Sequence, residues 1–221
     1  MGAMDELIDA AALERLRNQL RTASDTAFPA VARAAIEVDG LKLRQRVDLV
    51  AAALIDDLPS VYGDAAKIVR SALSDPEFSG WTIWPVGEAM TALALASVIG
   101  TDFEDGLAMM ADLTPRLSSE FAIRPFLVRD LDRSLAVIEI WTGSDDPHVR
   151  RLASEGTRSY LPWAIRVPEL LRRPECTVPI LDALYRDDDE VVRRSVANHL
   201  NDLSRHAPDV VVATAARWTA A

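Results

Sequence analysis

A seven-residue segment that occurs twice in the C-terminal half constrains the fold more than any other feature. Residues 145–151 (Asp-Asp-Pro-His-Val-Arg-Arg) align with residues 188–194 (Asp-Asp-Glu-Val-Val-Arg-Arg) at a constant offset of 43, and five of the seven positions are identical. In each copy an aspartate can cap the start of a helix, the shared valine turns into the core, and arginine faces out. The two copies predict one structural unit repeated along the chain.

The rest of the chain has a helical pattern. Apolar residues recur every three or four positions, as at Leu7, Ala10 and Leu13, and strand-like alternation is nearly absent. A period of about 40 to 47 residues, with Asp-x-x-Val-Arg opening a second helix, is typical of HEAT-type helix pairs. We therefore predict an all-α fold, a HEAT-like repeat solenoid (an α-α superhelix), forming a single domain whose concave face suits an extended partner, most commonly a protein.

The repeat also predicts boundaries. The domain should span residues 5–221, with its clearest repeats over 130–160 and 177–206, and residues 1–4 resemble a cloning scar. The expected helix pairs are 132–141 with 148–160, 178–185 with 190–205, and a degenerate earlier pair, 106–111 with 118–127.

Charge is distributed unevenly along the chain. The net charge is −10, but residues 1–120 carry 10 basic and 19 acidic side chains, whereas residues 121–175 carry 9 and 8. All 14 basic residues beyond position 120 are arginine, whose planar fork suits phosphate oxygens. High-GC codon usage would produce the same bias. The overall acidity would confine any contact with nucleic acid to an arginine-lined groove.

Several classes of protein are not expected. Cys176 is the only cysteine, and the three histidines lack metal-ligand spacing, so we predict no disulfide, no metal and no cofactor. No apolar stretch approaches the roughly 20 residues that span a bilayer, and no basic targeting segment is present. These features predict a cytoplasmic protein that does not bind a membrane. We also expect a monomer and, should the chain act on DNA in a prokaryote, association with the nucleoid.

One helix face in the last repeat carries polar groups. Val192, Val196, His199 and Leu203 fall on one side, and the other side carries Arg194, Asn198, Asn201, Asp202 and Arg205. Shifted back by 43 residues, three of the polar positions become Arg151, Glu155 and Arg158. A solvated convex face would look similar, but the uncharged Asn198 and Asn201 favour a binding surface.

The tryptophans leave two interpretations open. Trp163 follows Pro162 in the turn after the Arg151–Arg158 stretch, where it either covers a repeat junction or stacks on a ligand. Trp81 and Trp84 share this ambiguity, while Trp141 is predicted to be structural.

Three ordered blocks, spanning about 85 residues, resemble the AlkC branch of the AlkC/AlkD DNA alkylation repair family. They are residues 119–126 (Ser-Glu-Phe-Ala-Ile-Arg-Pro-Phe), 149–163 (from Val-Arg-Arg to Leu-Pro-Trp) and 192–202 (from Val-Arg-Arg to Asn-His-Leu-Asn-Asp). That family consists of HEAT-like monofunctional glycosylases that excise cationic alkylpurines from double-stranded DNA, notably 3-methyladenine and, in the AlkD branch, 7-alkylguanine.

The resemblance implies a set of site residues. Glu120 and Asp202 would be the catalytic carboxylates and Trp163 would contact the lesion. The DNA-binding residues would be Arg124, Arg151, Arg158, Arg194, Asn198 and Asn201. A lyase would need an amine nucleophile, and neither Lys42 nor Lys67 lies near these blocks, so we expect base excision without strand cleavage.

The residues also allow a second interpretation without catalysis. Glu120 could be a helix N-terminal acid, and Asp202 could pair with Arg205 or Arg194. The whole chain could be a non-catalytic HEAT-repeat adaptor that binds a protein or damaged DNA. Members of the branch usually continue with another helix pair beyond residues 207–221, and some carry an immunoglobulin-like domain, so the C-terminus reads as shortened. The preferred adduct and any base flipping are not predicted.

Overall fold

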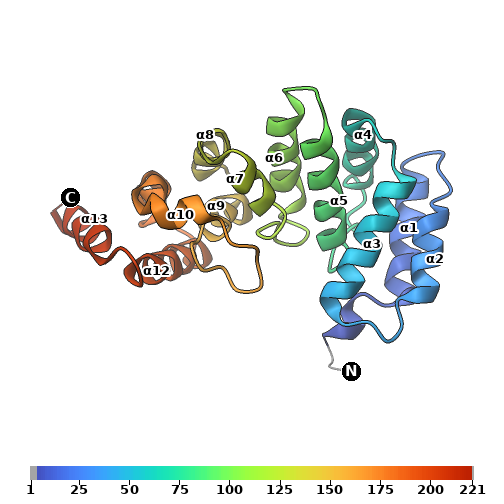
Figure 1. Cartoon of the computed structure of the whole chain (residues 1–221), viewed down its shortest axis with the longest axis horizontal. Helices are drawn as coiled ribbons and strands as arrows, with labels where there is room; N and C mark the ends of the chain where they lie inside the picture. Colours follow the sequence, from blue (N-terminus) through green and yellow to red (C-terminus); the bar gives the residue numbers. More distant parts are fainter. Residues whose placement is uncertain (1–3, 221) are drawn as a thin grey trace. The chain divides into compact units, whose positions relative to one another are not determined.

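The computed structural model describes residues 4–220, and every regular element in this part of the chain is helical (Figure 1). The all-α prediction is therefore confirmed. The chain divides into two compact units, one ending at Leu117 and the other beginning at Ser118, whereas the sequence predicted a single domain over 5–221. Most of the expected cloning scar, Met1–Ala3, and the terminal Ala221 lie outside the described residues.

The first unit is built from helix pairs that stack on one another. Helix α3 packs on α5 and α4 on α6, while α2 packs on both α1 and α3. Its elements are η1 (Asp5–Leu7), α1 (Ala10–Thr22), α2 (Pro29–Glu37), α3 (Leu43–Asp57), α4 (Tyr62–Ala72), α5 (Ile83–Ala96) and α6 (Asp102–Leu113). Helix α5 is buried on most of its circumference, as expected of a central helix.

The second unit contains both copies of the repeated segment, residues 145–151 and 188–194. Helix α9 packs on α11 and α12, and α13 packs on α12. The elements are α7 (Arg124–Arg129), α8 (Leu131–Ile140), η2 (Trp141–Gly143), α9 (Pro147–Glu155), α10 (Pro168–Arg172), η3 (Pro174–Thr177), α11 (Val178–Leu184), α12 (Glu190–Ser204) and α13 (Pro208–Ala220). Trp141 is buried, as predicted.

The two copies of the repeated segment form the same helix start. The Asp146 carboxylate accepts a hydrogen bond from the backbone N–H of His148, and the Asp189 carboxylate accepts one from that of Val191, each at 2.8 Å. Val149 and Val192 are both buried, so the predicted cap and core position are confirmed.

The prediction that the shared arginine faces out is wrong for Arg150. Its guanidinium folds back and donates to the carbonyl oxygens of Ser144 and Asp145. Arg193 makes the equivalent bonds one repeat later, to the carbonyls of Asp187 and Asp188. The arginine therefore holds the turn that precedes each second helix, because those carbonyls have no partner within a helix.

Two predicted helices are shorter than expected. The first helix of the second unit begins at Arg124 rather than at residue 118, with Pro125 in its first turn, where a missing N–H costs nothing. Helix α9 ends at Glu155 rather than at residue 160, and the chain then forms an irregular loop over residues 156–167. This shortening creates the loop that carries Trp163.

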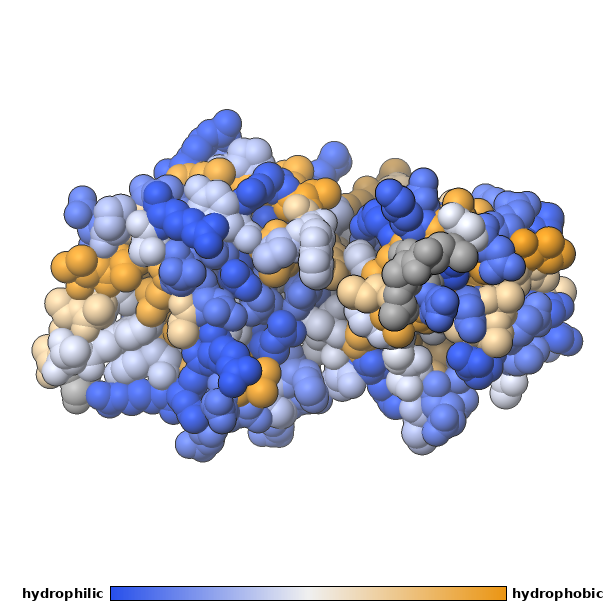
Figure 2. All heavy atoms as spheres, turned by 90° about the horizontal axis from the view of Figure 1, so that it is seen from below, coloured by the Kyte–Doolittle hydropathy of each residue, from blue (hydrophilic) through white to orange (hydrophobic). Residues whose placement is uncertain are grey.

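The surface in Figure 2 is largely hydrophilic, with apolar side chains in small separate groups on the face that is drawn. Among the described residues, no helix is both long enough and apolar enough to cross a membrane.

Candidate active site

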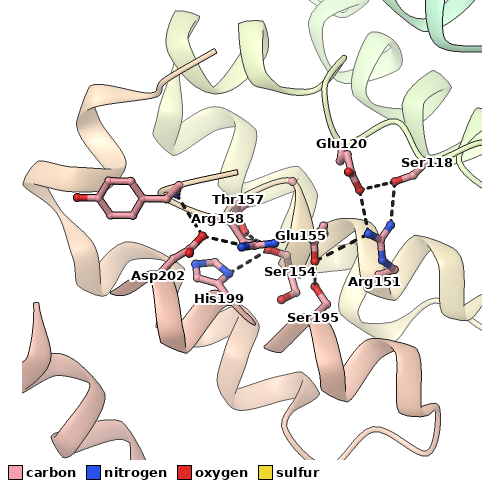
Figure 3. Close-up of polar contacts among 12 residues, drawn as sticks. Ser118, Glu120, Arg151, Ser154, Glu155, Thr157, Arg158, Ser195, His199 and Asp202 are labelled. Carbon is pink, nitrogen blue, oxygen red and sulfur yellow. Dashed lines mark hydrogen bonds and ion pairs between the residues drawn. The ribbon is translucent and has the colours of Figure 1, made fainter. Parts of the chain in front are cut away.

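The second unit contains a chain of alternating acidic and basic side chains that links the two predicted catalytic carboxylates (Figure 3). It runs from Glu120 through Arg151, Glu155 and Arg158 to Asp202. Three of its five members lie on α9 or in the turn that follows it, and Asp202 comes from α12, so the repeat packing brings the set together.

Asp202 occupies the buried end of this network. Only 1 % of its side chain is exposed, which contradicts the prediction that it lies on the exposed stripe of α12. Its Oδ2 accepts hydrogen bonds from Arg158 Nε at 2.9 Å and from the backbone N–H of Tyr160 at 3.3 Å. A carboxylate this deeply buried is tolerated because a cation and an N–H face it. The pairing predicted with Arg205 or Arg194 is not formed.

Glu120 occupies the more accessible end, with 16 % of its side chain exposed. Its Oε2 lies 3.0 Å from Arg151 Nη2 and accepts a hydrogen bond from the Ser118 hydroxyl at 2.9 Å. Arg151 Nη1 donates to the same hydroxyl oxygen. Glu120 precedes α7 by four residues, so it is not a helix N-terminal acid of that helix in the structure.

Glu155 lies between the two ends, and no site role was predicted for it. Its Oε1 accepts from Arg158 Nη1 at 2.5 Å, its Oε2 accepts from the Ser195 hydroxyl at 2.7 Å, and the same oxygen lies 3.9 Å from Arg151 Nη2. Burial by itself would lower the pKa of Arg158, but its hydrogen bonds to Asp202 and Glu155 outweigh burial and raise that pKa above its ordinary value. Arg158 therefore remains a cation.

A buried, neutral histidine lies on the same helix as Asp202. His199 is fully buried on α12, one turn before Asp202, and burial lowers its pKa to about 4. Its Nδ1 lies 2.9 Å from the carbonyl oxygen of Ser154, and its Nε2 lies 3.2 Å from the Thr177 hydroxyl. Because a carbonyl can only accept, Nδ1 carries the proton and Nε2 accepts from Thr177.

Arg124 does not have the role predicted for it. Its side chain has no exposed surface, so the prediction that it contacts a phosphate is wrong. It donates instead to the carbonyl oxygens of Gly156, Arg158 and Ile165. These three carbonyls belong to the loop over 156–167, so Arg124 fixes both ends of that loop.

Trp163 lies near the middle of this loop and is 85 % exposed. That exposure excludes the interpretation of Trp163 as a cover over a repeat junction. Its backbone φ is +61°, a left-handed conformation that is strained for a bulky residue and tends to be kept at functional sites. The loop is anchored beside the network, because Tyr160, three residues before Trp163, donates its N–H to Asp202.

The other predicted DNA-binding residues lie outside the network. Arg194, Asn198 and Asn201 are exposed on α12, and Arg194 pairs with Glu190. Arg151 and Arg158 are partly accessible, with 25 % and 12 % of their side chains exposed. In the first unit, Trp84 is mostly buried and donates from Nε1 to Glu88, so of its two ambiguous tryptophans Trp81 is the more accessible.

Fold and site together define a class: a helical-repeat protein whose second unit holds three partly or fully buried carboxylates connected by two arginines. No family model matches the chain. A solved structure, the Pseudomonas fluorescens alkylpurine DNA glycosylase AlkC bound to DNA containing an abasic site analogue, is similar with a TM-score of 0.84 and 31 % identity over 96 % of this chain. The uncharacterised protein YhaZ of Bacillus subtilis (strain 168) is 35 % identical over 178 residues.

The chain is thus similar to an AlkC glycosylase in both fold and sequence, which confirms the resemblance predicted from the three sequence blocks. This chain spans 58 % of the length of the Pseudomonas chain. Its match to the Bacillus protein covers 80 % of this chain and 48 % of that protein.

Proposed function

We propose that the chain is a DNA glycosylase that releases cationic alkylated purines, with 3-methyladenine as the foremost substrate and 7-alkylguanine as a further one. The observation that carries this proposal is the network that joins Glu120 to Asp202 within one unit. Its three carboxylates and two guanidiniums have a formal charge of −1, so a cationic base is electrostatically complementary to it and a normal base is not.

Release of a cationic base requires that the site stabilise positive charge on the sugar and position a water molecule. An alkylated purine with a positive charge leaves with the electron pair of its N-glycosidic bond, which neutralises it, and positive charge develops on the sugar. A preorganised carboxylate stabilises that charge. Water then forms a bond to the same sugar carbon and gives its proton to a carboxylate. Glu120, as the more accessible acid, is suited to contact the water, and Asp202 to stabilise the sugar.

Trp163 completes the proposed site. An indole can stack on a cationic base because its face carries negative charge. The exposed, strained position of Trp163 supports this role, since it packs on nothing that would explain its conformation.

The deciding experiment measures bases released from methylated duplex DNA by the wild type and by Glu120→Gln and Asp202→Asn. We expect each substitution to lower the rate of release by about 100-fold, the scale on which single charge-stabilising groups act. Glu169→Gln is the matched control, because Glu169 is a half-exposed acid of the same unit that lies outside the network and pairs with the nearby Arg172. No release by the wild type, or full activity in both variants, would show the proposal to be wrong.

Asp202→Asn removes one partner of a buried ion pair, which typically destabilises a protein by several kcal/mol. Its fold must therefore be checked by circular dichroism and its affinity for DNA measured separately. Trp163→Ala gives a cleaner second test, since loss of an exposed side chain should leave the melting temperature unchanged while base release falls.

A second candidate is a non-catalytic adaptor, which is a common use of stacked helix pairs. The exposed residues Asn198 and Asn201 on α12 favour such an adaptor, because they could contact a partner without the network. An adaptor would bind DNA or protein and release no base, so the same assay separates the two.

A further inference from the structure

The loop over residues 156–167 is flanked by cations that no carboxylate neutralises. The guanidinium carbon of Arg166 lies 4.7 Å from the centre of the Tyr160 ring, and that of Arg205 lies 5.5 Å from the same centre. Neither arginine forms an ion pair with any residue between 4 and 220. The one hydrogen bond from Arg166 goes to the carbonyl oxygen of Ser159. Two positive charges are therefore held on one aromatic ring.

This pair differs from several arginines of the same unit; Arg129, Arg186 and Arg193 also form no ion pair with a described residue, but Arg166 and Arg205 are held together on one ring. Arg150, Arg151, Arg158, Arg173 and Arg217 each face a carboxylate within 3.0 Å. In a unit with 14 basic and 16 acidic residues, two neighbouring arginines without an acid are an unbalanced local charge. An unbalanced charge that is held in place is suited to an anionic ligand.

Two further groups lie against this cluster. The ring of His206 packs edge-on against Tyr160 with 5.5 Å between centres, and both of its nitrogens are buried without a hydrogen-bond partner. Behind the loop, the pKa of Arg124 is lowered to about 10, first by burial and then by the positive charges of Arg166 and Arg158.

The cluster also lies beside the proposed active site. Tyr160 donates its backbone N–H to Asp202, and Arg205 follows Asp202 by three residues at the end of α12. Trp163 lies between Tyr160 and Arg166 in the same loop. Whatever binds this cluster is therefore placed next to both Asp202 and the exposed indole.

We propose that Arg166 and Arg205, held on the ring of Tyr160, bind backbone phosphates of the DNA strand that enters the active site. This inference rests on the proposed function and adds a phosphate site to it. The guanidinium fork matches phosphate oxygens in two parallel hydrogen bonds. Stacking on tyrosine holds the forks in place before DNA arrives, which lowers the entropy cost of binding.

The spacing agrees with this ligand. Because both guanidinium carbons lie within 6 Å of one ring centre, they are at most about 10 Å apart. A DNA strand carries a phosphate for about every 3.4 Å along the duplex axis. The two arginines can therefore bind phosphates that are close together on one strand. Such binding would fix the position of that strand relative to Asp202 and Trp163.

The test measures binding of a fluorescent duplex to the full chain by anisotropy across a series of salt concentrations. Arg166→Ala and Arg205→Ala should each lower the slope of log affinity against log salt by about 0.9 and weaken binding about eightfold at 0.1 M salt. Arg129→Ala is the matched control, because Arg129 is an exposed arginine of the same unit outside the cluster, and its slope should stay at the wild-type value.

Each result decides the matter. Unchanged slopes for Arg166→Ala and Arg205→Ala, an equal fall for Arg129→Ala, or no DNA binding by the wild type would overturn the phosphate site. If the wild type releases no alkylated base but both slopes fall, the phosphate site stands and the glycosylase proposal fails. If Arg166→Ala disturbs the loop, Arg205→Ala at an exposed helix end still gives the answer, and Arg205→Lys should restore the slope because it restores the charge.

Discussion

Gly156 lies where two segments approach too closely for any larger residue. A Cβ at this position would meet Ile123 Cδ1 at 2.1 Å and the Leu152 carbonyl oxygen at 3.1 Å. Ile123 is itself fully buried, so it has little room to move. We expect Gly156→Ala to lower the free energy of unfolding by roughly 1–3 kcal/mol through overpacking.

The measurement is urea unfolding at neutral pH, with two comparisons. Gly143→Ala is the matched control, because nothing lies within 4 Å of a Cβ at Gly143 and its φ is not positive. The double variant Gly156→Ala with Ile123→Val should recover part of the loss, since it removes the clashing methyl group. Equal stability of Gly156→Ala and Gly143→Ala would contradict the expectation.

His199 should make the second unit sensitive to acid. Its folded pKa of about 4 lies below the ordinary value of 6.5, because burial disfavours the charged ring. Between these two values the unfolded chain binds a proton that the folded protein does not. Stability is therefore lost as pH falls from 6.5 towards 4, by roughly 3 kcal/mol in total, and is unaffected by this group above pH 6.5.

His199→Gln tests this expectation, because glutamine can donate to Ser154 and accept from Thr177 but does not titrate. Urea unfolding at several pH values should show the wild type more stable at pH 7 and the difference shrinking on acidification. Parallel curves for the two proteins down to pH 4 would show that His199 does not set the pH dependence.

At the scale of elements, Arg150 joins successive repeats. Its guanidinium forms two hydrogen bonds to the Asp187 carboxylate, at 2.7 and 2.9 Å, besides those to its own turn. Arg193, its equivalent one repeat later, holds its own turn but forms no ion pair with a described residue. Arg150 therefore makes a bond to the next repeat that Arg193 lacks, and it is also less exposed than Arg193.

We expect Arg150→Ala to cost roughly 2–4 kcal/mol, since it leaves a mostly buried carboxylate without its cation, and Arg193→Ala roughly 1 kcal/mol. The hydrogen bond from Arg150 lowers the pKa of Asp187, so this stabilisation is present above about pH 3.9 and is lost as pH falls further. Chemical unfolding of both variants at pH 7 and pH 3 measures the difference between their unfolding free energies. A difference of the same size at both pH values would contradict its assignment to the ion pair between Arg150 and Asp187.

The repeat was predictable from sequence because its signals are local. Asp146, Asp189, Val149 and Val192 act within one turn of their own helix. The burial of Asp202 was not predictable, because it depends on Arg158, which lies 44 residues earlier and reaches Asp202 only after α9 and α12 pack. Helical periodicity assigns a carboxylate to the polar face of its helix, and it contains no information about a partner on another helix.

The role of Arg124 also depends on residues that are distant in the sequence. Its place in a motif beside Glu120 suggested phosphate binding, but the carbonyls it holds belong to a loop that begins 32 residues later. Only the family resemblance singled out both Glu120 and Asp202 as site residues. Neither acid has a local sequence signal that distinguishes it from a surface residue.

For the whole molecule, charge separates the two units. The first unit has 10 basic and 18 acidic residues, whereas the second has 14 and 16. Contact with a polyanion is therefore expected mainly through the second unit, at the paired and unpaired arginines around the loop. Binding through so few cations should have a modest salt dependence compared with strongly basic DNA-binding proteins.

The lysines of the whole chain bear on whether the proposed base release is followed by strand cleavage. Lys42 and Lys67 are the only lysines, and both lie in the first unit, while Glu120 and Asp202 lie in the second. Strand cleavage by a lyase would need an amine that attacks the sugar. We therefore expect the lysine-free variant, Lys42→Gln with Lys67→Gln, to release alkylated bases at the wild-type rate.

The products distinguish the two mechanisms directly. The DNA strand should stay intact at the abasic site until it is treated with alkali, and borohydride should trap no covalent complex. Lys67 is exposed and pairs only with the nearby Asp64, so its loss should not disturb folding, which a melting curve can confirm. A borohydride-trapped complex that the lysine-free variant cannot form would instead establish a lyase, and would require one of these amines to reach the network.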